Sequence, residues 1–177
     1  VNLSAQQFNQ NDLLEHVECS IKGHGLTTDL LEVELTESSI MQDPEFAARV
    51  LGRLSAAGVR VTIDDFGTGY SSLAYLKRFP LDALKIDRSF VRDVTHDPSD
   101  GAIVRTIIAL AQHLGLDVVA EGVETLGQLE FLRANQCRYA QGFLFSPPVA
   151  GDEIYTVIDR LEREGTAQKT DEMRLEA

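Results

Sequence analysis

Apolar and polar residues alternate in short stretches along this chain, and most of these stretches are followed by apolar residues at helical spacing. Alternation with a period of two predicts a strand, and apolar positions three and four apart predict a helix. Strands are expected at 1–4, 31–35, 59–63, 83–87, 117–121 and 139–145. Helices are expected at 6–22, from Pro44 to Gly58, between 99 and 113, after Thr125, and from 151 to about 164, whereas 97–100 is expected to be a loop.

Strand-then-helix units in strict succession imply a parallel sheet covered by helices, either an open doubly wound sheet or a closed barrel. No G-x-G-x-x-G pattern follows the first expected strand, which disfavours a dinucleotide-binding open sheet. A complete barrel has eight units in typically about 250 residues. The prediction is therefore an α/β fold, a TIM-type (β/α) barrel with about six βα units of a modified (β/α)8 barrel and with the N-terminal units missing. One domain would span 1–164, followed by a polar, frayed tail at 165–177.

Composition narrows the possible functions. The 177 residues carry a net charge of −12, which argues against a nucleic-acid groove lined with Lys and Arg. Cys19 and Cys137 lie far apart and lack the spacing of a zinc site or a disulfide framework, which favours a reducing cytoplasm. No apolar run is long enough to cross a membrane, and residues 1–4 do not resemble a signal peptide.

The stretch 64–72, with the sequence Asp-Asp-Phe-Gly-Thr-Gly-Tyr-Ser-Ser, is the first candidate for chemistry. Two adjacent carboxylates stand where the expected strand 59–63 ends. Taken alone, they are compatible with a divalent metal site, an acid/base pair, or a capped turn, because Asp is also a common cap and turn residue.

The other strand ends change the balance between these three interpretations. In a barrel of this kind the carboxyl ends of the strands meet at one face, which carries the active site. The polar residues at or near those ends are Asn2, Glu34, Asp64, Asp65, Lys85, Asp87, Glu121 and Gln141. Carboxylates and amide oxygens without a convergent His or Cys suit Mg²⁺ or Mn²⁺. A two-metal site would explain the adjacent acids and would promote attack at phosphorus, with Lys85 stabilising the hydroxide or the developing charge.

Six ordered motifs together resemble one family. They are Asn-Leu-Ser at 2–4, Glu-Leu-Thr-Glu at 34–37, the stretch 64–72, Leu-Lys-Ile-Asp at 84–87, Ala-Glu-Gly-Val-Glu-Thr at 120–125 and Gln-Gly-Phe-Leu-Phe at 141–145. The chain resembles the EAL-domain cyclic di-GMP phosphodiesterases of bacteria up to about residue 161. The resemblance implies a modified TIM barrel that hydrolyses cyclic di-GMP to linear pGpG with Mg²⁺ or Mn²⁺.

The resemblance also implies a role for each matching residue. Asn2, Glu34 and Asp64 would hold one metal ion, and Asp64, Asp65 and Glu121 the second. Lys85 would contact the attacking water, supported by Asp87, and Gln141 would place water or substrate. Glu37 and Glu124 would hold the loop 66–72, which the family also uses in dimerisation and regulation.

The sequence departs from the family at its first motif. The Glu-Ala-Leu tripeptide, whose Glu is a further metal ligand, is expected upstream of Asn2 together with the Arg that follows it, and full activity is expected only with that segment. A non-catalytic cyclic di-GMP receptor is the alternative, and a different Mg²⁺-dependent barrel using Lys85 as a base is a third hypothesis. Expected partners are cyclic di-GMP, a second copy in a homodimer, and an N-terminal sensory or cyclase domain in the parent chain. DNA, RNA and a membrane are not expected partners of this segment.

Overall fold

The computed structural model describes residues 1–10, 12–69 and 72–163. These residues form a five-stranded parallel sheet in the order β1-β2-β3-β4-β5. The strands are β1 (Glu32–Thr36), β2 (Arg60–Phe66), β3 (Ala83–Ile86), β4 (Asp117–Ala120) and β5 (Tyr139–Ala140). Each strand lies beside the one before it in the sequence and the order never reverses, which is the winding of a barrel and not of a doubly wound sheet. The predicted barrel segment is confirmed.

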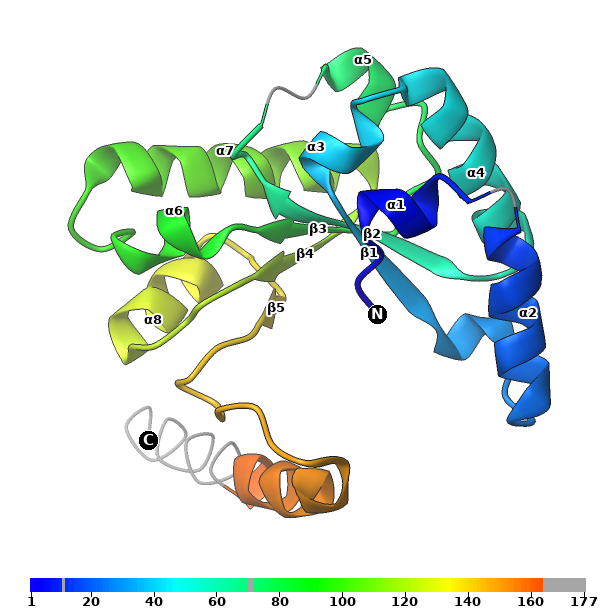
Figure 1. Cartoon of the computed structure of the whole chain (residues 1–177). Coiled ribbons are helices and arrows are strands. Elements are labelled where there is room, and N and C mark those ends of the chain that lie inside the picture. Colours follow the sequence, from blue (N-terminus) through cyan, green and yellow to red (C-terminus); the bar gives the residue numbers. More distant parts are fainter. Residues whose placement is uncertain (11, 70–71, 164–177) are drawn as a thin grey trace.

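Helices follow the strands and lie along the outside of the curved sheet (Figure 1). They are α1 (Ala5–Phe8), α2 (Leu13–Gly23), α3 (Glu37–Ile40), α4 (Pro44–Ala56), α5 (Leu73–Leu76), α6 (Arg88–Arg92), α7 (Pro98–Leu114) and α8 (Leu126–Ala134), with 3-10 turns at η1 (Thr28–Leu30) and η2 (Gly151–Glu153). Residues 154–163 form a further helix below the sheet in the same view.

The hydrophobic core lies between the sheet and these helices. In β1, Val33 and Leu35 are buried while Glu32 and Glu34 are half-buried on the opposite face, as the alternation predicted. α4 packs against β2, and α7 packs against β3 and β4. The apolar residues therefore face the helices, and the polar residues of β1 face the barrel interior.

The first residues lie beside β1. The Leu3 amide donates to the Glu34 carbonyl and the Glu34 amide donates to the Val1 carbonyl, both at 2.9 Å, so Asn2 forms a parallel bridge with Glu34. The expected strand at 1–4 is thus a single bridge. Because paired residues project to the same side of a sheet, this bridge places the Asn2 side chain on the face that carries Glu34.

The helix expected over 6–22 is wrong, because two helices stand there. α1 ends at Phe8, where Asn9 is its C-cap, and α2 starts at Leu13 after Asp12. Asn and Asp side chains compete with the helical hydrogen bonds of the backbone and favour helix ends, which accounts for the break. Residue 11 lies outside the described residues.

Two other boundaries also differ from the prediction. The stretch 97–100 is the start of α7, where Asp97 caps the helix through the Ser99 amide and Pro98 takes its first position. The expected strand 139–145 stops at Ala140, because Gly142 turns the chain with φ 156° and the Phe145 amide bonds back to the Gly142 carbonyl. The short helices α3 and α6 were not predicted, and the tail at 165–177 lies outside the described residues.

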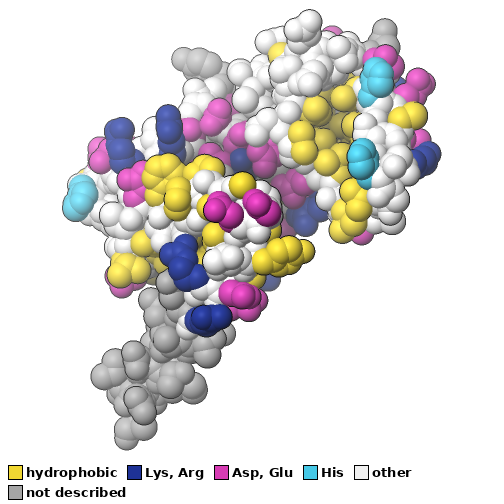
Figure 2. All heavy atoms as spheres, turned by 60° about the horizontal axis from the view of Figure 1, so that its bottom comes forward, with side chains coloured by type: hydrophobic (Ala, Val, Ile, Leu, Met, Phe, Trp, Pro, Cys, Tyr) yellow, Lys and Arg dark blue, Asp and Glu magenta, His cyan; other side chains and the backbone are white. Residues whose placement is uncertain are grey.

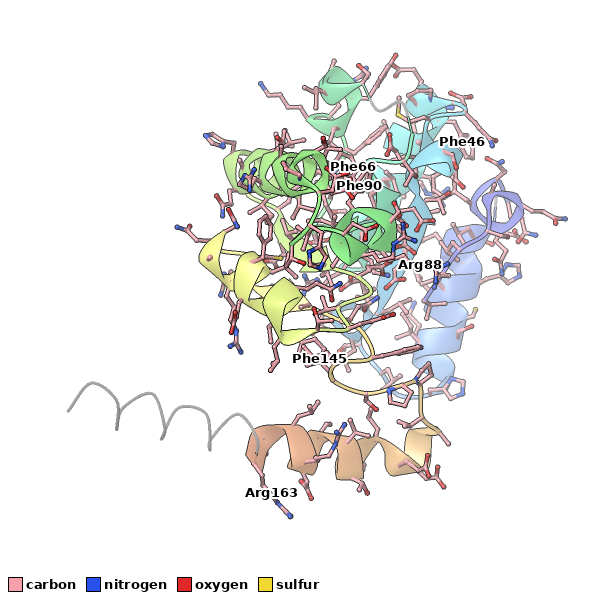
Figure 3. All side chains as sticks on the ribbon, turned by 90° about the vertical axis from the view of Figure 1, so that its left-hand side faces the viewer. Phe46, Phe66, Arg88, Phe90, Phe145 and Arg163 are labelled. Carbon is pink, nitrogen blue, oxygen red and sulfur yellow. The ribbon has the colours of Figure 1, made fainter. Side chains whose placement is uncertain are left out.

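The final helix is joined to the segment that follows β5. The Arg160 guanidinium donates to the carbonyl of Phe145, which lies between the sheet and this helix (Figure 3). Within the described residues no helix is both long and apolar enough to span a membrane.

Candidate metal and catalytic site

The two adjacent carboxylates of β2 depend on an irregularity in the strand. Successive side chains of a regular strand point to opposite faces, so Asp64 and Asp65 could not share one. The register between β2 and β3 shifts between Ile63 and Phe66, and Asp65 takes a left-handed backbone with φ 53°. A bulge of this kind re-aims a side chain, and here carboxylate oxygens of both Asp residues come within 4.8 Å of one another. Asp65 carries the backbone strain that this arrangement requires.

Lys85 lies at the centre of the acidic residues. Its ammonium nitrogen is 2.9 Å from Glu34 Oε2, 3.2 Å from Asp64 Oδ1 and 2.6 Å from Glu121 Oε1. The three carboxylates come from β1, from β2 and from the residue after β4, and Lys85 comes from β3, which lies between β2 and β4 in the sheet. Figure 2 shows Asp and Glu side chains gathered near the centre of this face with a Lys or Arg side chain among them. Lys85 itself is 6% exposed, in a strand whose four residues are all buried.

Protonation within the cluster follows from these contacts. Burial alone would lower the pKa of Lys85, but the hydrogen bonds that it donates to Glu121 and Glu34 outweigh this effect and raise the pKa above its ordinary value. Burial raises the pKa of Glu121, against the opposing effect of Lys85. Burial and the charge of Asp64 also raise the pKa of Asp65. Lys85 is therefore an ammonium at neutral pH, and Glu121 and Asp65 lose their protons less readily than exposed carboxyl groups do.

Asp87 is placed by the helix that follows it. Its side chain accepts hydrogen bonds from the Ser89 amide, at 2.9 Å, and from the Ser89 hydroxyl, and so caps α6. Burial would raise the pKa of Asp87, but these bonds lower it overall, and a hydrogen bond shared with Asp65 lowers it further. Asp87 thus lies beside Asp65. Its predicted support of Lys85 stays a prediction, because no bond joins the two side chains in the described part of the chain.

Gln141 and Asn2 join the same group from its two sides. The Gln141 amide donates to Glu121 Oε1 at 2.6 Å, the same oxygen that Lys85 contacts. Asn2 stands opposite Glu34 in the bridge to β1. All the residues predicted to bind metal or water therefore come from strand ends at one face of the sheet.

Of the two acids predicted to hold the loop 66–72, one contacts it. Glu37 is 2% exposed, and its Oε2 accepts the amides of Gly67 at 3.0 Å and Gly69 at 3.3 Å. Glu124 is exposed, and no hydrogen bond joins its side chain to residues 66–69, so its role stays a prediction. Residues 70 and 71 of this loop lie outside the described residues.

The donor set fits a hard divalent cation. Asp64, Asp65 and Glu121 each offer a carboxylate oxygen, and these atoms lie within 4.8 Å of one another. Glu34 and the amide oxygen of Asn2 are further oxygen donors at the same face. An all-oxygen set of this composition suits Mg²⁺, Mn²⁺ or Ca²⁺.

A cavity of about 460 Å³ opens beside this cluster. Glu121, Gln141 and Arg88 line it on the polar side, and Phe143 and Pro147 on the apolar side. Arg88 stands at the start of α6 (Figure 3), and the sequence analysis did not single it out. Its position directly after Asp87, at the end of β3, is the signal that could have found it.

Comparison with known proteins identifies the family. The family model described as EAL domain matches residues 1–148. The chain belongs to the EAL domain family. Its relatives include the cyclic di-GMP phosphodiesterase NbdA of Pseudomonas aeruginosa, 50% identical over 149 residues, which are 84% of this chain and 19% of NbdA. Another is the bifunctional diguanylate cyclase/cyclic di-GMP phosphodiesterase MucR of the same species, 48% identical over 87% of this chain and 22% of MucR.

Solved EAL structures have the same fold. The PaMucR phosphodiesterase in complex with c-di-GMP superposes with a TM-score of 0.85 at 48% identity, covering 87% of this chain and 62% of that one. The Klebsiella pneumoniae protein BlrP1, with manganese and cy-diGMP, gives a TM-score of 0.77 at 38% identity, over 83% of this chain and 38% of BlrP1. The chain spans about a fifth of the length of the curated relatives it matches.

Proposed function

We propose that this EAL chain carries the metal-binding and water-orienting residues of a phosphodiesterase that hydrolyses cyclic di-GMP to linear pGpG. One observation carries the proposal. A buried lysine lies within 3.2 Å of carboxylates from three strands, beside two further acids and an amide at the same strand ends. A protein that only held the ligand would have no need of this water-activating set. The names of NbdA and MucR support the choice of substrate.

Asp64, Asp65 and Glu121 would hold one divalent ion, and Asn2, Glu34 and Asp64 a second. Bound Mg²⁺ or Mn²⁺ would lower the pKa of water and neutralise charge on the phosphoryl oxygens. The donor set does not distinguish these two metals, and the manganese complex of BlrP1 supports Mn²⁺ as one of them. The left-handed backbone of Asp65 keeps both β2 carboxylates on the ion-binding face.

The remaining residues would position water and substrate. Lys85 keeps its proton at neutral pH, so its ammonium is a hydrogen-bond donor fixed in the acidic cluster, able to orient a water and to stabilise negative charge developing at phosphorus. Gln141 fixes the Glu121 carboxylate through their 2.6 Å bond. The cavity beside Glu121 would take part of the nucleotide, with Phe143 and Pro147 as its apolar wall.

The setting of the domain is also part of the proposal. Two free thiols, Cys19 and Cys137, suit the reducing cytoplasm. A homodimer is proposed near the loop held by Glu37, where Leu73 at the start of α5 is 62% exposed. A Leu73→Asp substitution that left the mass in solution unchanged would contradict that surface. A sensory or cyclase domain in the same parent chain is proposed from the size of MucR, of which the match covers 22%.

The test uses the complete gene product that carries residues 1–177. It is incubated with cyclic di-GMP and Mg²⁺ or Mn²⁺, with a chelator-treated sample as control, and the products are separated by chromatography. Metal-dependent appearance of linear pGpG is the expected result. Tight binding of intact cyclic di-GMP without product would instead support the non-catalytic receptor, and neither binding nor product would remove this nucleotide as the ligand.

A further inference from the structure

Gln128 has more hydrogen-bond partners than its local role requires. It is the third residue of α8, and with the N-cap Thr125 it forms a capping box: the Gln128 amide donates to Thr125 Oγ1, and Gln128 Oε1 accepts the Thr125 amide at 2.9 Å. The same Oε1 also accepts the Glu124 amide at 2.8 Å. Its Nε2 donates to the Arg92 carbonyl at 3.0 Å, a residue 36 positions away.

Burial separates this residue from an ordinary cap. Gln128 is 5% exposed, whereas a second capping box among the described residues, formed by Ser4 and Gln7 at α1, is exposed. Within the part of the chain that the structure describes, the Gln7 side chain bonds to the amide and hydroxyl of Ser4 and to no other residue. Capping alone therefore explains one of the three bonds of the Gln128 side chain.

The two segments that Gln128 joins both lead into the acidic cluster. Arg92 is the last residue of α6, a helix that begins directly after Asp87 and thus three residues after Lys85. Glu124 and Thr125 belong to the loop 121–125, which begins with Glu121. Gln128 thus connects the loop that follows β4, which begins with Glu121, to the helix that follows β3, and Glu121 lies 2.6 Å from Lys85.

The loop 121–125 is packed tightly against the first residue of α6. A Cβ at Gly122, whose φ is +67°, would lie 2.6 Å from Cβ of Arg88. On its other side Val123 is fully buried and exchanges backbone bonds with Gln141 and Leu144. The loop therefore has little space to move toward the start of α6, and the bond from Gln128 to the Arg92 carbonyl joins it to the end of the same helix.

We propose that Gln128 is a positioning residue that holds the loop 121–125 against α6 and so fixes the Glu121 carboxylate relative to Lys85. This inference rests on the proposed function, in which Glu121 binds metal. A displacement of Glu121 by a fraction of an ångström would weaken catalysis more than substrate binding.

Gln128→Glu is the sharpest variant. A carboxylate keeps the acceptor of the capping box, since Glu serves there as well as Gln, but it cannot donate to the Arg92 carbonyl. If Gln128→Glu does not fold, Gln128→Met is used instead, because Met has a similar size and brings no buried charge. The expected changes in kcat, KM and Mn²⁺ affinity are then the same. Thr125→Ala is the matched control, because it removes the hydroxyl of the cap and leaves the bridge to Arg92.

The experiment measures kcat and KM for cyclic di-GMP, and Mn²⁺ affinity by calorimetry, in the complete gene product. Gln128→Glu is expected to lower kcat at least 10-fold with KM changed less than 2-fold, and to weaken Mn²⁺ binding at least 3-fold. Thr125→Ala is expected to lower Tm and to keep the kcat of the unsubstituted protein. Unchanged kcat and Mn²⁺ affinity in Gln128→Glu, or an equal loss of kcat in Thr125→Ala, would overturn the proposal. If the unsubstituted protein shows no turnover, the proposed function fails, and Mn²⁺ affinity alone then decides the role of Gln128 by the same criterion.

Discussion

Oε1 of Glu121 accepts two hydrogen bonds, from the Lys85 ammonium and from the Gln141 amide, each at 2.6 Å. One carboxylate oxygen thus joins the ends of β3, β4 and β5, three neighbouring strands of the barrel sheet. The contact links fold to chemistry, because the donors that orient Glu121 are fixed by the strand register itself.

Removing the central cation should cost stability unless a metal replaces it. Lys85→Met leaves Glu34, Asp64 and Glu121 facing one another without a compensating charge, and breaking a buried ion pair in this way costs about 3 kcal/mol. We expect a clear fall in unfolding free energy in the presence of a chelator, measured by urea denaturation, with part of the loss restored by Mg²⁺. Turnover should fall at least 100-fold even with metal. A Lys85→Met protein as stable as the unsubstituted one under chelation would show that the carboxylates do not repel.

The stability of the metal-free protein should depend on pH through Asp65. The pKa of Asp65 is raised in the folded state. Over the pH range between its unfolded pKa, near 3.8, and its folded pKa, the Asp65 carboxyl keeps its proton in the folded protein but loses it in the unfolded chain. The stabilisation is complete below about pH 3.8 and is lost as pH rises through the folded pKa. Asp65→Asn removes this titration. In a chelator, the stability of the unsubstituted protein relative to Asp65→Asn should therefore decline from pH 4 to 7.

Divalent metal should reverse that trend. Metal binding needs the ionised carboxylate, so added Mn²⁺ should raise Tm more at pH 7 than at pH 5.

Asp87 affects the pH dependence of the metal-free protein in the opposite sense to Asp65, because its lowered pKa gives stability above about pH 3.8 that is lost at lower pH. A relative stability of Asp65→Asn that is flat from pH 4 to 7 would contradict the burial and charge effects on Asp65.

The left-handed backbone at Asp65 can be tested against a second position of the same kind. Asp65 and Gln136 are the two residues other than glycine with positive φ in the described part of the chain, at 53° and 63°. Asp65→Val should lower the free energy of unfolding by about 1–2 kcal/mol, measured by thermal denaturation. Asp65→Asn should lower it little, because Asn tolerates the left-handed conformation. Gln136→Gly is the control and should leave turnover unchanged and stability equal or higher. Equal stabilities of Asp65→Val and Asp65→Asn would mean that the bulge does not strain the backbone.

The loop held by Glu37 offers a steric test. A Cβ at Gly69 would lie 2.9 Å from Oε1 of Glu37, so Gly69→Ala should push the carboxylate away from the amides of Gly67 and Gly69. We expect it to reproduce Glu37→Gln, with a loss of about 2 kcal/mol and faster hydrogen exchange at the Gly67 amide. Gly52→Ala, where nothing lies within 4 Å of the new Cβ, should instead stabilise α4 by about 1 kcal/mol. If hydrogen exchange at the Gly67 amide is as slow in the Gly69→Ala variant as in the Gly52→Ala variant, the role of Glu37 is contradicted.

The sequence was sufficient for the sheet and for much of the site because both follow simple periodicities. The alternation of β1 placed Glu34 inward, and the rule that strand ends converge placed it with Lys85 and Glu121. The bulge at Asp65 could not be predicted, because a register shift depends on pairing with β3 and not on local composition. The polar run after Phe8 and the glycine at 142 moved two element ends that apolar spacing had set.

Contacts between residues far apart in the sequence could not be predicted from the pattern of apolar and polar positions. The pair Thr125 and Gln128 could be recognised as a capping box, but the bond from Gln128 to the Arg92 carbonyl depends on how α6 and α8 pack. Likewise Glu37 was assigned to its loop by family resemblance, and only the fold shows that its carboxylate accepts the Gly67 and Gly69 amides.

Turnover of cyclic di-GMP by the complete gene product and its Asp64→Asn variant tests the central claim most directly. Asp64 is the residue expected to serve both metal ions, and its carboxylate lies 3.2 Å from Lys85, so the neutral amide should remove metal binding while preserving shape. With saturating Mn²⁺ we predict metal-dependent formation of pGpG by the unsubstituted protein and a rate at least 100-fold lower in Asp64→Asn, with its fold intact by circular dichroism. Equal rates in the two proteins, or pGpG formed equally well in a chelator, would contradict the account.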